Sequence, residues 1–410
     1  ALGLTILICG ALGFGILLAG MPVASFYGIP DLAGIFAILS ISFFVAPYIS
    51  IPMSLLARDM EFGTQFYIRV TATIVNAIAV VGLIFLGFSY FSLAIARAMA
   101  ALTQFFMLLW IRPVGMQYIP RFRGMKPIAS FGIFNSLALV ARKAQYTLPD
   151  MIIGKMGSTG QVGMFSRGLG FIQFVSETVF MGVQPVALPY MAQVRRKGEE
   201  IKAAYMKASV LLGAFLIPVL GVASLSALPA IRLMFGDQWD AAAPVAAWLA
   251  VWAMLRSFHW FTSPMLMAIG REGVMLAREV LPFLLLIPAI IVTFSGGLQS
   301  IAKGFVMVGV IELLVTTFLV MWQLKMSLSE FLQAWLSTMA VGALCIAATL
   351  VILFFLPATD TPAWMFIGVE ALVLPPVWLG ALFLTRNPLA NEIHVAYQET
   401  IKKIGNARKS

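Results

Sequence analysis

Charged side chains inside an apolar stretch are the first sign of chemistry in this sequence. The segment LVARKAQYTLPDMIIGK, residues 139–155, holds Arg142, Lys143 and Asp150, although only 11% of the whole chain is charged. Asn135, Arg142 and Tyr146 fall within about 40° of one another on a helix, and Lys143 and Asp150 lie beside them. This face predicts a contact with water or with an anion.

Other apolar segments carry polar residues at similar helical spacings. In residues 163–190, Gln173 and Glu177 share an arc of about 60° with Ser166, Gly170 and Gln184. In residues 240–268, the spacings of four, four, three and four join Trp248, Trp252, Arg256, His259 and Ser263. Shorter stripes are Arg97 with Gln104, and Arg69 with Thr73 and Asn76. Several helices with polar stripes predict a hydrated cavity between them.

The composition identifies the elements that carry these stripes as membrane-spanning helices. Hydrophobic residues make up 61% of the 410 residues, against about 45–50% in soluble domains. Apolar runs long enough to cross about 30 Å of hydrocarbon recur along the whole chain. The sequence therefore predicts an all-α, polytopic integral membrane protein.

About twelve transmembrane helices are expected. Their predicted bounds are 1–27, 31–56, 66–88, 90–111, 128–154, 163–190, 203–226, 240–268, 272–296, 300–325, 329–356 and 362–385.

Basic residues predict the orientation of these spans, because short cytoplasmic loops collect Lys and Arg. Nineteen of the 27 Lys and Arg residues fall in or beside alternate loops and the tail, and three fall on the other side. The basic group of loops is 57–65, 112–127, 191–202, 269–271, 326–328 and the tail 386–410. We predict that these segments, the C-terminus included, are cytoplasmic. The net charge of +10 is then a topology signal and requires no nucleic acid partner.

The sequence offers little for enzymatic or metal chemistry. The only histidines are His259 and His394, and no HExxH, CxxC, GxSxG or GxxxxGK[ST] pattern occurs. We therefore expect a protein that is not an enzyme, with no cofactor and no metal site.

Structural roles for the buried charges stay open at this stage. Arg97 and Arg167 can extend to the membrane interface, and Glu177 can be a protonated interhelical contact. Arg142 and Lys143 can form ion pairs with Asp150 or Glu177 that serve only packing. The tryptophans of residues 240–268 can equally be packing aromatics.

Three runs of residues resemble the bacterial lipid-linked oligosaccharide flippases. They are LPDMIIGKMGSTGQVGMFSRGLGF at 148–171, QPVALPYMAQVRRKGEEIKAAY at 184–205 and PMSLLARDMEF at 52–62. These flippases form the polysaccharide-transport branch of the multidrug/oligosaccharidyl-lipid/polysaccharide exporter superfamily. The resemblance extends over nearly the whole chain.

The resemblance implies two bundles around a central cavity. Residues 1–127 would be the remnant of an N-lobe with four helices, 128–326 a six-helix C-lobe, 327–385 two peripheral helices and 386–410 a basic cytoplasmic tail. Such proteins typically have fourteen helices, so the resemblance implies two further helices, and about 70–90 further residues are expected before Ala1.

The implied function is translocation of an undecaprenyl-pyrophosphate-linked oligosaccharide across the bacterial inner membrane by alternating access. The pathway would be exopolysaccharide, capsule or lipopolysaccharide synthesis, with a polysaccharide polymerase and a chain-length regulator as possible partners besides membrane lipids. Arg142, Lys143 and Arg256 would hold pyrophosphate or acidic sugars. The other cavity candidates are Asn135, Tyr146, Asp150, Gln173, Glu177, His259 and Arg97.

Three other functions fit parts of the same pattern. A multidrug/cation antiporter of the same fold would favour carboxylates in its cavity, whereas the candidates here are mostly basic, with Asp150, Glu177 and Glu312 as the acidic ones. A lipid II flippase is a closer alternative. An O-antigen ligase or polymerase would need a large external loop, and no connection exceeds about seventeen residues.

The charge asymmetry generates a testable topology. Single cysteines placed in loops 112–127 and 191–202 are expected to stay unlabelled when an impermeant maleimide is added to intact cells, and to react after the cells are opened. Efficient labelling of either loop in intact cells would reverse the predicted orientation.

Overall fold

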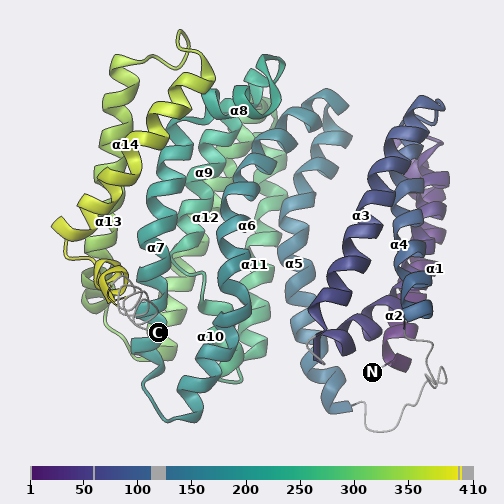
Figure 1. The fold of residues 1–410 in the computed structure, drawn as a ribbon, viewed down its shortest axis with the longest axis horizontal. Coiled ribbons are helices and arrows are strands. Elements are labelled where there is room, and N and C mark those ends of the chain that lie inside the picture. Colours follow the sequence, from purple (N-terminus) through teal and green to yellow (C-terminus); the bar gives the residue numbers. More distant parts are fainter. Residues whose placement is uncertain (1, 59–60, 112–125, 396–397, 399–410) are drawn as a thin grey trace, which may run out of the picture. The chain divides into compact units, whose positions relative to one another are not determined.

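The computed structural model describes residues 2–58, 61–111, 126–395 and 398 (Figure 1). Every regular element in this described part is a helix, which confirms the predicted all-α fold class. The chain divides into two compact units, Ala1–Ser130 and Phe131–Ser410. The division falls in the first turns of α5 (Lys126–Met156).

Four helices of the first unit precede that division: α1 (Leu2–Tyr27), α2 (Leu32–Arg58), α3 (Phe62–Phe85) and α4 (Phe91–Ile111). Leu56, Ile68 and Leu108 bury their side chains together between α2, α3 and α4. On α4 the buried face is made of alanines, Ala96 and Ala100 among them. Small residues on such a face let neighbouring helix backbones approach closely.

The second unit contains the remaining helices of the described chain. They are α5, α6 (Thr159–Arg196), α7 (Ile201–Leu225), α8 (Ala227–Phe235), the 3-10 helix η1 (Asp237–Ala242), α9 (Ala243–Ser257), α10 (Thr262–Ala268), α11 (Glu272–Thr293), the 3-10 helix η2 (Phe294–Gly296), α12 (Gly297–Leu324), α13 (Leu328–Phe355) and α14 (Ala363–Leu384). One large apolar core runs through this unit, and Trp252, Tyr205 and Phe165 are its largest fully buried side chains.

The starts of α6 and α13 show how local sequence fixes helix ends. Ser158 and Gln161 form a capping box at α6, in which each side chain bonds the backbone N–H of the other residue. Ser327 and Glu330 repeat the arrangement at α13. Each box satisfies two backbone donors that a helix start otherwise leaves without partners.

The predicted span 240–268 is wrong as a single helix. It divides into η1, α9 and α10, with a turn at residues 258–261 between the last two (Figure 1). Pro264 supplies the physical reason, because a proline ring clashes with the carbonyl four residues earlier, here that of Trp260. At the third position of α10, Pro264 needs no intrahelical N–H partner.

A second departure lies just before this span, where the sequence was expected to form only a connection. Residues 227–235 form the short helix α8, followed by η1. Arg232 of α8 donates two hydrogen bonds to Asp240 of η1, from Nε to Oδ1 at 2.9 Å and from Nη2 to Oδ2 at 2.6 Å. This paired fork holds the two short elements together.

The helix α13 packs against α7 in the second unit, and α14 packs against α13 and α8 (Figure 1). Trp378 of α14 donates its indole N–H to the carbonyl of Ala214 at 2.9 Å. Asn387, just after α14, donates to the Thr338 hydroxyl of α13 at 3.0 Å. These polar bonds fasten the terminal helix pair, for which the sequence predicted a peripheral place.

Within the described residues, nine segments are long and apolar enough to cross a membrane. One of them, Glu272–Leu324, includes both α11 and α12. The helices α5 and α6 are not among the nine, although they have 31 and 38 residues. Charged and amide side chains such as Arg142, Lys143, Gln173 and Glu177 lie within these two helices and lower their mean hydropathy.

Two glycines of α6 test how tightly this helix packs. A Cβ at Gly168 would lie 3.0 Å from the carbonyl oxygen of Ala242 and 3.0 Å from the backbone nitrogen of Ala246, whereas a Cβ at Gly170 would meet nothing within 4 Å. We expect Gly168→Ala to destabilise the protein by about 1–3 kcal/mol through overpacking. The matched control Gly170→Ala is expected to be neutral or stabilising by up to about 1 kcal/mol.

The melting temperatures of the two variants in detergent compare these effects directly. A Gly168→Ala protein that melts as high as Gly170→Ala would contradict the close contact between α6 and the start of α9.

Candidate functional site

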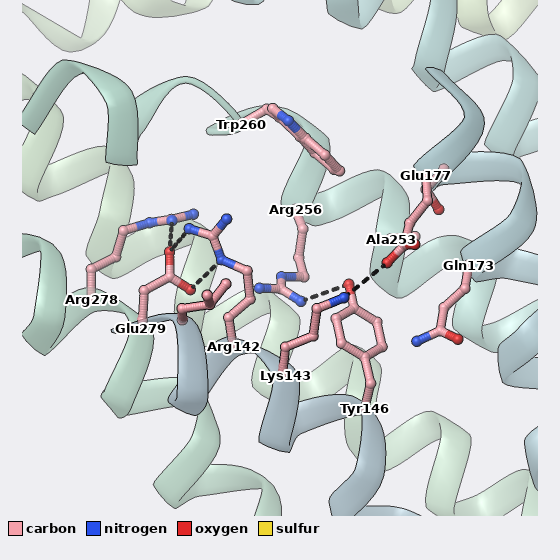
Figure 2. A pocket seen from close by; sticks show the side chains of 12 residues that line it. Arg142, Lys143, Tyr146, Gln173, Glu177, Ala253, Arg256, Trp260, Arg278 and Glu279 are labelled. Carbon is pink, nitrogen blue, oxygen red and sulfur yellow. Dashed lines mark hydrogen bonds and ion pairs between the residues drawn. The ribbon is translucent and has the colours of Figure 1, made fainter. Parts of the chain in front are cut away.

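A cavity of ≈ 290 Å³ lies wholly within the second unit. Its walls come from α5, α6, α9, α11 and the turn that follows α9. Figure 2 shows its polar side chains, which converge from these separate segments. They are Arg142, Lys143, Tyr146, Gln173, Ser176, Glu177, Arg256, Arg278 and Glu279, with Trp260 on the turn.

The strongest contact in this wall joins Arg142 of α5 to Glu279 of α11. The guanidinium donates through Nε to Oε2 at 3.2 Å and through Nη2 to Oε1 at 2.7 Å, a bidentate fork (Figure 2). The Glu279 side chain is only 1% exposed, whereas that of Arg142 is 33% exposed. Arg142 therefore connects the buried carboxylate with the space of the cavity.

A second arginine reaches the same carboxylate from α11 itself. Arg278 Nη1 lies 2.7 Å from Glu279 Oε1, and its side chain is 7% exposed. The Ser263 hydroxyl of α10 accepts from both arginines at 3.1 Å and donates to Glu279 Oε1 at 2.8 Å. Glu279 is thus held by two cations and one hydroxyl, as a buried charge requires.

Arg256 of α9 extends this arrangement to α12. Its Nε lies 3.2 Å from Glu312 Oε2, and Arg278 Nη2 lies 3.5 Å from Glu312 Oε1. The Arg256 guanidinium also lies over the Trp252 ring, 4.9 Å from its centroid, and donates to the Tyr146 hydroxyl at 3.4 Å. Stacking on an aromatic face and pairing with a carboxylate fix the direction of this planar cation.

We call the set Arg142, Arg256, Arg278, Glu279 and Glu312 the charge cluster. It holds three cations and two carboxylates and so carries one positive charge in excess. Four of its five side chains are at most 11% exposed, and only Arg142 has substantial access to the cavity. The excess charge is therefore available to a ligand at Arg142.

The rim of the cavity carries a looser ion pair. Lys143 of α5 lies 3.7 Å from Glu177 of α6, and the two side chains are 67% and 41% exposed. Exposed pairs of this kind contribute about 0–1 kcal/mol. Either partner can therefore exchange this contact for a ligand at little cost.

His259 lies behind the wall in the turn between α9 and α10 and is buried. Its ring nitrogens lie 2.9 Å from the Tyr205 hydroxyl and 2.8 Å from the Thr317 hydroxyl. The ring also stacks on Phe331, with centroids 5.5 Å apart. This histidine holds the turn in place and does not line the cavity.

Six of the ten side chains predicted to line a cavity meet in this one: Arg142, Lys143, Tyr146, Gln173, Glu177 and Arg256. Arg97 lies in the first unit, with its side chain exposed. The Asn135 side chain lies outside the part of the structure that is described.

The structure does not contain the pairing of Arg142 with Asp150, which the sequence left open as one structural alternative. Asp150 instead accepts a hydrogen bond from the Ser166 hydroxyl of α6 at 2.7 Å and is absent from the cavity wall. Asp150 lies about two turns further along α5 than Arg142, whereas Glu279 of α11 lies directly beside the Arg142 guanidinium. The alternative pairing of Lys143 with Glu177 is confirmed.

Arg278 and Glu279 line the cavity although neither was predicted from the sequence as a cavity candidate. Both are buried in α11, six and seven residues from its start at Glu272. An adjacent Arg–Glu pair within an apolar span was the signal available in the sequence. Opposite charges at such a depth require partners on neighbouring helices.

The described residues provide no cluster of side chains suited to bind a metal ion. No group of three or more His, Cys, Asp or Glu side chains among those residues could hold a metal ion. The cavity instead presents guanidinium, ammonium, phenol and amide groups, which bind anions and hydroxyl-rich ligands.

The buried and the exposed ion pairs predict losses of stability of very different size when the acid is neutralised. Glu279→Gln removes the carboxylate shared by two buried arginines, so we expect a loss of about 3–5 kcal/mol of stability. The control Glu177→Gln breaks the exposed pair with Lys143 and is expected to cost at most about 1 kcal/mol. Melting temperatures and the yield of monodisperse protein measure both effects, and equal stabilities for the two variants would contradict the assigned role of Glu279.

The chain was compared with curated proteins. It is 23% identical over 361 residues to the teichuronic acid biosynthesis protein TuaB of Bacillus subtilis, an alignment that covers 83% of this chain and 72% of the relative. The succinoglycan biosynthesis transport protein ExoT of Rhizobium meliloti is 26% identical over 58% of this chain and 49% of its own length. The lipopolysaccharide biosynthesis protein WzxC of Escherichia coli is 21% identical over 70% of this chain and 59% of its own length.

A solved structure shares the fold. The lipid II flippase MurJ, in an inward closed conformation, matches with a TM-score of 0.64 and 17% identity, over 93% of this chain and 81% of MurJ. The model of the polysaccharide biosynthesis protein family matches residues 4–244, more than half of the chain. With its apolar helices and the polar cavity between them, this multi-pass membrane protein belongs to the polysaccharide biosynthesis protein family.

Proposed function

We propose that this protein translocates an undecaprenyl-pyrophosphate-linked oligosaccharide across the bacterial inner membrane for exopolysaccharide, capsule or lipopolysaccharide synthesis. The observation that carries the proposal is the cavity wall, in which the excess positive charge of the charge cluster reaches solvent at Arg142. The similarity to a succinoglycan biosynthesis transport protein supports a saccharide cargo.

Each group of the wall has a distinct role in this proposal. In Arg142, Nε and Nη2 are engaged by Glu279 and Ser263, so Nη1 is the nitrogen left to donate to a pyrophosphate oxygen. Lys143 adds a mobile ammonium at the rim. Tyr146 and Gln173 offer a phenol and an amide to sugar hydroxyls, and the prenyl chain stays in lipid.

Transport in this proposal occurs by alternating access, in which the cavity is exposed to each side of the membrane in turn. The positive-inside asymmetry supports a cytoplasmic C-terminus. It stands at nineteen basic residues against three. A polysaccharide polymerase and a chain-length regulator are the partners that such a transporter would serve.

A cation antiporter is disfavoured by the pairing in the wall. Each carboxylate that contacts this cavity or its charge cluster is already compensated: Glu279 by Arg142 and Arg278, Glu312 by Arg256 and Arg278, and Glu177 by Lys143. A positive drug would find no uncompensated acid among these described groups. Lipid II carries the same pyrophosphate, so substrate assays must separate it from other lipid-linked saccharides.

Removing the cavity cation is expected to stop transport while the protein still folds. Arg142→Gln leaves Glu279 paired with Arg278 at 2.7 Å, so its membrane abundance is expected to stay near normal. The loss of charge-assisted hydrogen bonds worth about 1.5–3 kcal/mol predicts about a 10–100-fold reduction in translocation. The control Arg271→Gln removes an exposed cation from the turn before α11 and is expected to keep both abundance and transport.

The measurement uses full-length protein in proteoliposomes, with accessibility of the lipid-linked saccharide to an added glycosidase as the readout. Surface polysaccharide and an immunoblot of membranes give the parallel measurement in cells. Unchanged translocation in Arg142→Gln would overturn the proposed role of the cavity. Faster translocation of lipid II, or of ethidium, than of the lipid-linked oligosaccharide would assign the cavity to one of the two alternatives.

A further inference from the structure

A second polar cavity, of ≈ 620 Å³, lies wholly within the first unit, between α2, α3 and α4. We call it the α2–α4 groove. Six of its eight lining residues are polar: Ser50 and Ser54 of α2, Gln65, Arg69 and Thr73 of α3, and Gln104 of α4. Polar side chains gathered from three apolar helices are costly unless they face water or a ligand.

The hydroxyl groups of this groove are prepared to accept hydrogen bonds. Ser54 donates its proton to the carbonyl of Ser50 at 2.8 Å, and Thr73 donates to the carbonyl of Arg69 at 2.9 Å. Their oxygens keep lone pairs for a ligand donor. Gln65 donates through Nε2 to the carbonyl of Met53 at 2.7 Å, which ties α3 to α2 across the groove.

Arg69 provides the charge of the groove. Its side chain is exposed, and within the described residues it makes no side-chain hydrogen bond or ion pair. No carboxylate is among the described residues that line the groove. This differs from the other unit, where Arg142, Arg256 and Arg278 are each paired with glutamate. A guanidinium with uncommitted donors, beside hydroxyl and amide groups, is suited to a phosphate oxygen.

The depth of Arg69 indicates where such a phosphate would come from. Seven residues separate Arg69 from the start of α3 at Phe62, which is about 10 Å along the helix axis. Met53 and Ser54 lie in the last two turns of α2, at the same end of the unit. Because α2 and α3 are long and apolar enough to span a membrane, the groove lies within about the first third of these spans, where a long arginine side chain can reach toward the lipid phosphates of the nearer leaflet.

We propose that the α2–α4 groove is a second anion site, which binds the phosphate of a membrane lipid through Arg69 and Gln104. The lipid is the phosphate-bearing, saccharide-linked carrier, and for that identity the inference rests on the proposed function. The hydroxyl and amide groups of the groove would contact the first sugar, while the lipid chain stays in the bilayer. The sequence shows these residues only as stripes on separate helices.

Native mass spectrometry of the purified full-length protein tests the site, with undecaprenyl phosphate as the probe. Two equivalents are expected to bind to the wild type, one at each anion site. Arg69→Gln is expected to lower the affinity of one equivalent at least about tenfold. A tenfold step corresponds to about 1.4 kcal/mol, which the loss of one charge-assisted hydrogen bond supplies. Gln104→Leu is expected to lower it about threefold, as a neutral contact contributes less than a charged one.

Matched controls separate this site from general electrostatics and from the cavity of the second unit. Arg97→Gln removes another exposed arginine from α4 that lines neither cavity, and is expected to retain both equivalents. Arg142→Gln is expected to lose the other equivalent, and its double variant with Arg69→Gln to lose both. If Arg69→Gln loses one equivalent while Arg142→Gln loses none, the groove stands and the proposed function fails.

Two further probes identify the source of the phosphate. Weaker binding of phosphatidylglycerol, with the same loss in Arg69→Gln, supports a lipid phosphate site that prefers the polyprenyl carrier. Equal binding of both lipids contradicts the carrier assignment. Undiminished lipid binding in a folded Arg69→Gln protein, or Arg69-dependent binding of inorganic phosphate alone, overturns the proposal.

Discussion

The Glu279 carboxylate, buried between Arg142 and Arg278, is the contact on which the second unit depends. A lone charge buried there would cost several kcal/mol, so at least one arginine must reach it, and here two do. Because they come from α5 and α11, and because Ser263 of α10 bonds all three, the charge orients these helices toward one point.

The same arrangement explains how a structural ion pair can also serve a ligand. Two carboxylates cannot neutralise three guanidinium groups, so one positive charge remains, and burial confines access to it to Arg142. Arg278 keeps Glu279 paired whatever Arg142 contacts. Arg142 can therefore give up part of its contact with Glu279 for a pyrophosphate, and no uncompensated charge is left in the hydrocarbon.

The two polar cavities differ in how their arginines are held. In the charge cluster of the second unit each arginine already has a carboxylate, which lowers the gain from binding an anion and favours its release. In the α2–α4 groove Arg69 has no such competitor among its lining residues, so a phosphate would gain the full electrostatic attraction. A transporter needs both properties, because a substrate must be captured and later released.

The sequence by itself determined the membrane class, the helical fold and most helix bounds, because apolar length and the 3.6-residue period are local properties of the chain. It also identified Arg142, Lys143, Tyr146, Gln173, Glu177 and Arg256, since polar residues inside apolar spans are costly and therefore conspicuous. The pairing was decided only by the tertiary structure. Asp150 was the nearest acid along the chain, yet Arg142 pairs with Glu279, 137 residues away. Which carboxylate meets which arginine depends on how helices pack, and that packing brings together residues whose separation in sequence carries no periodic signal.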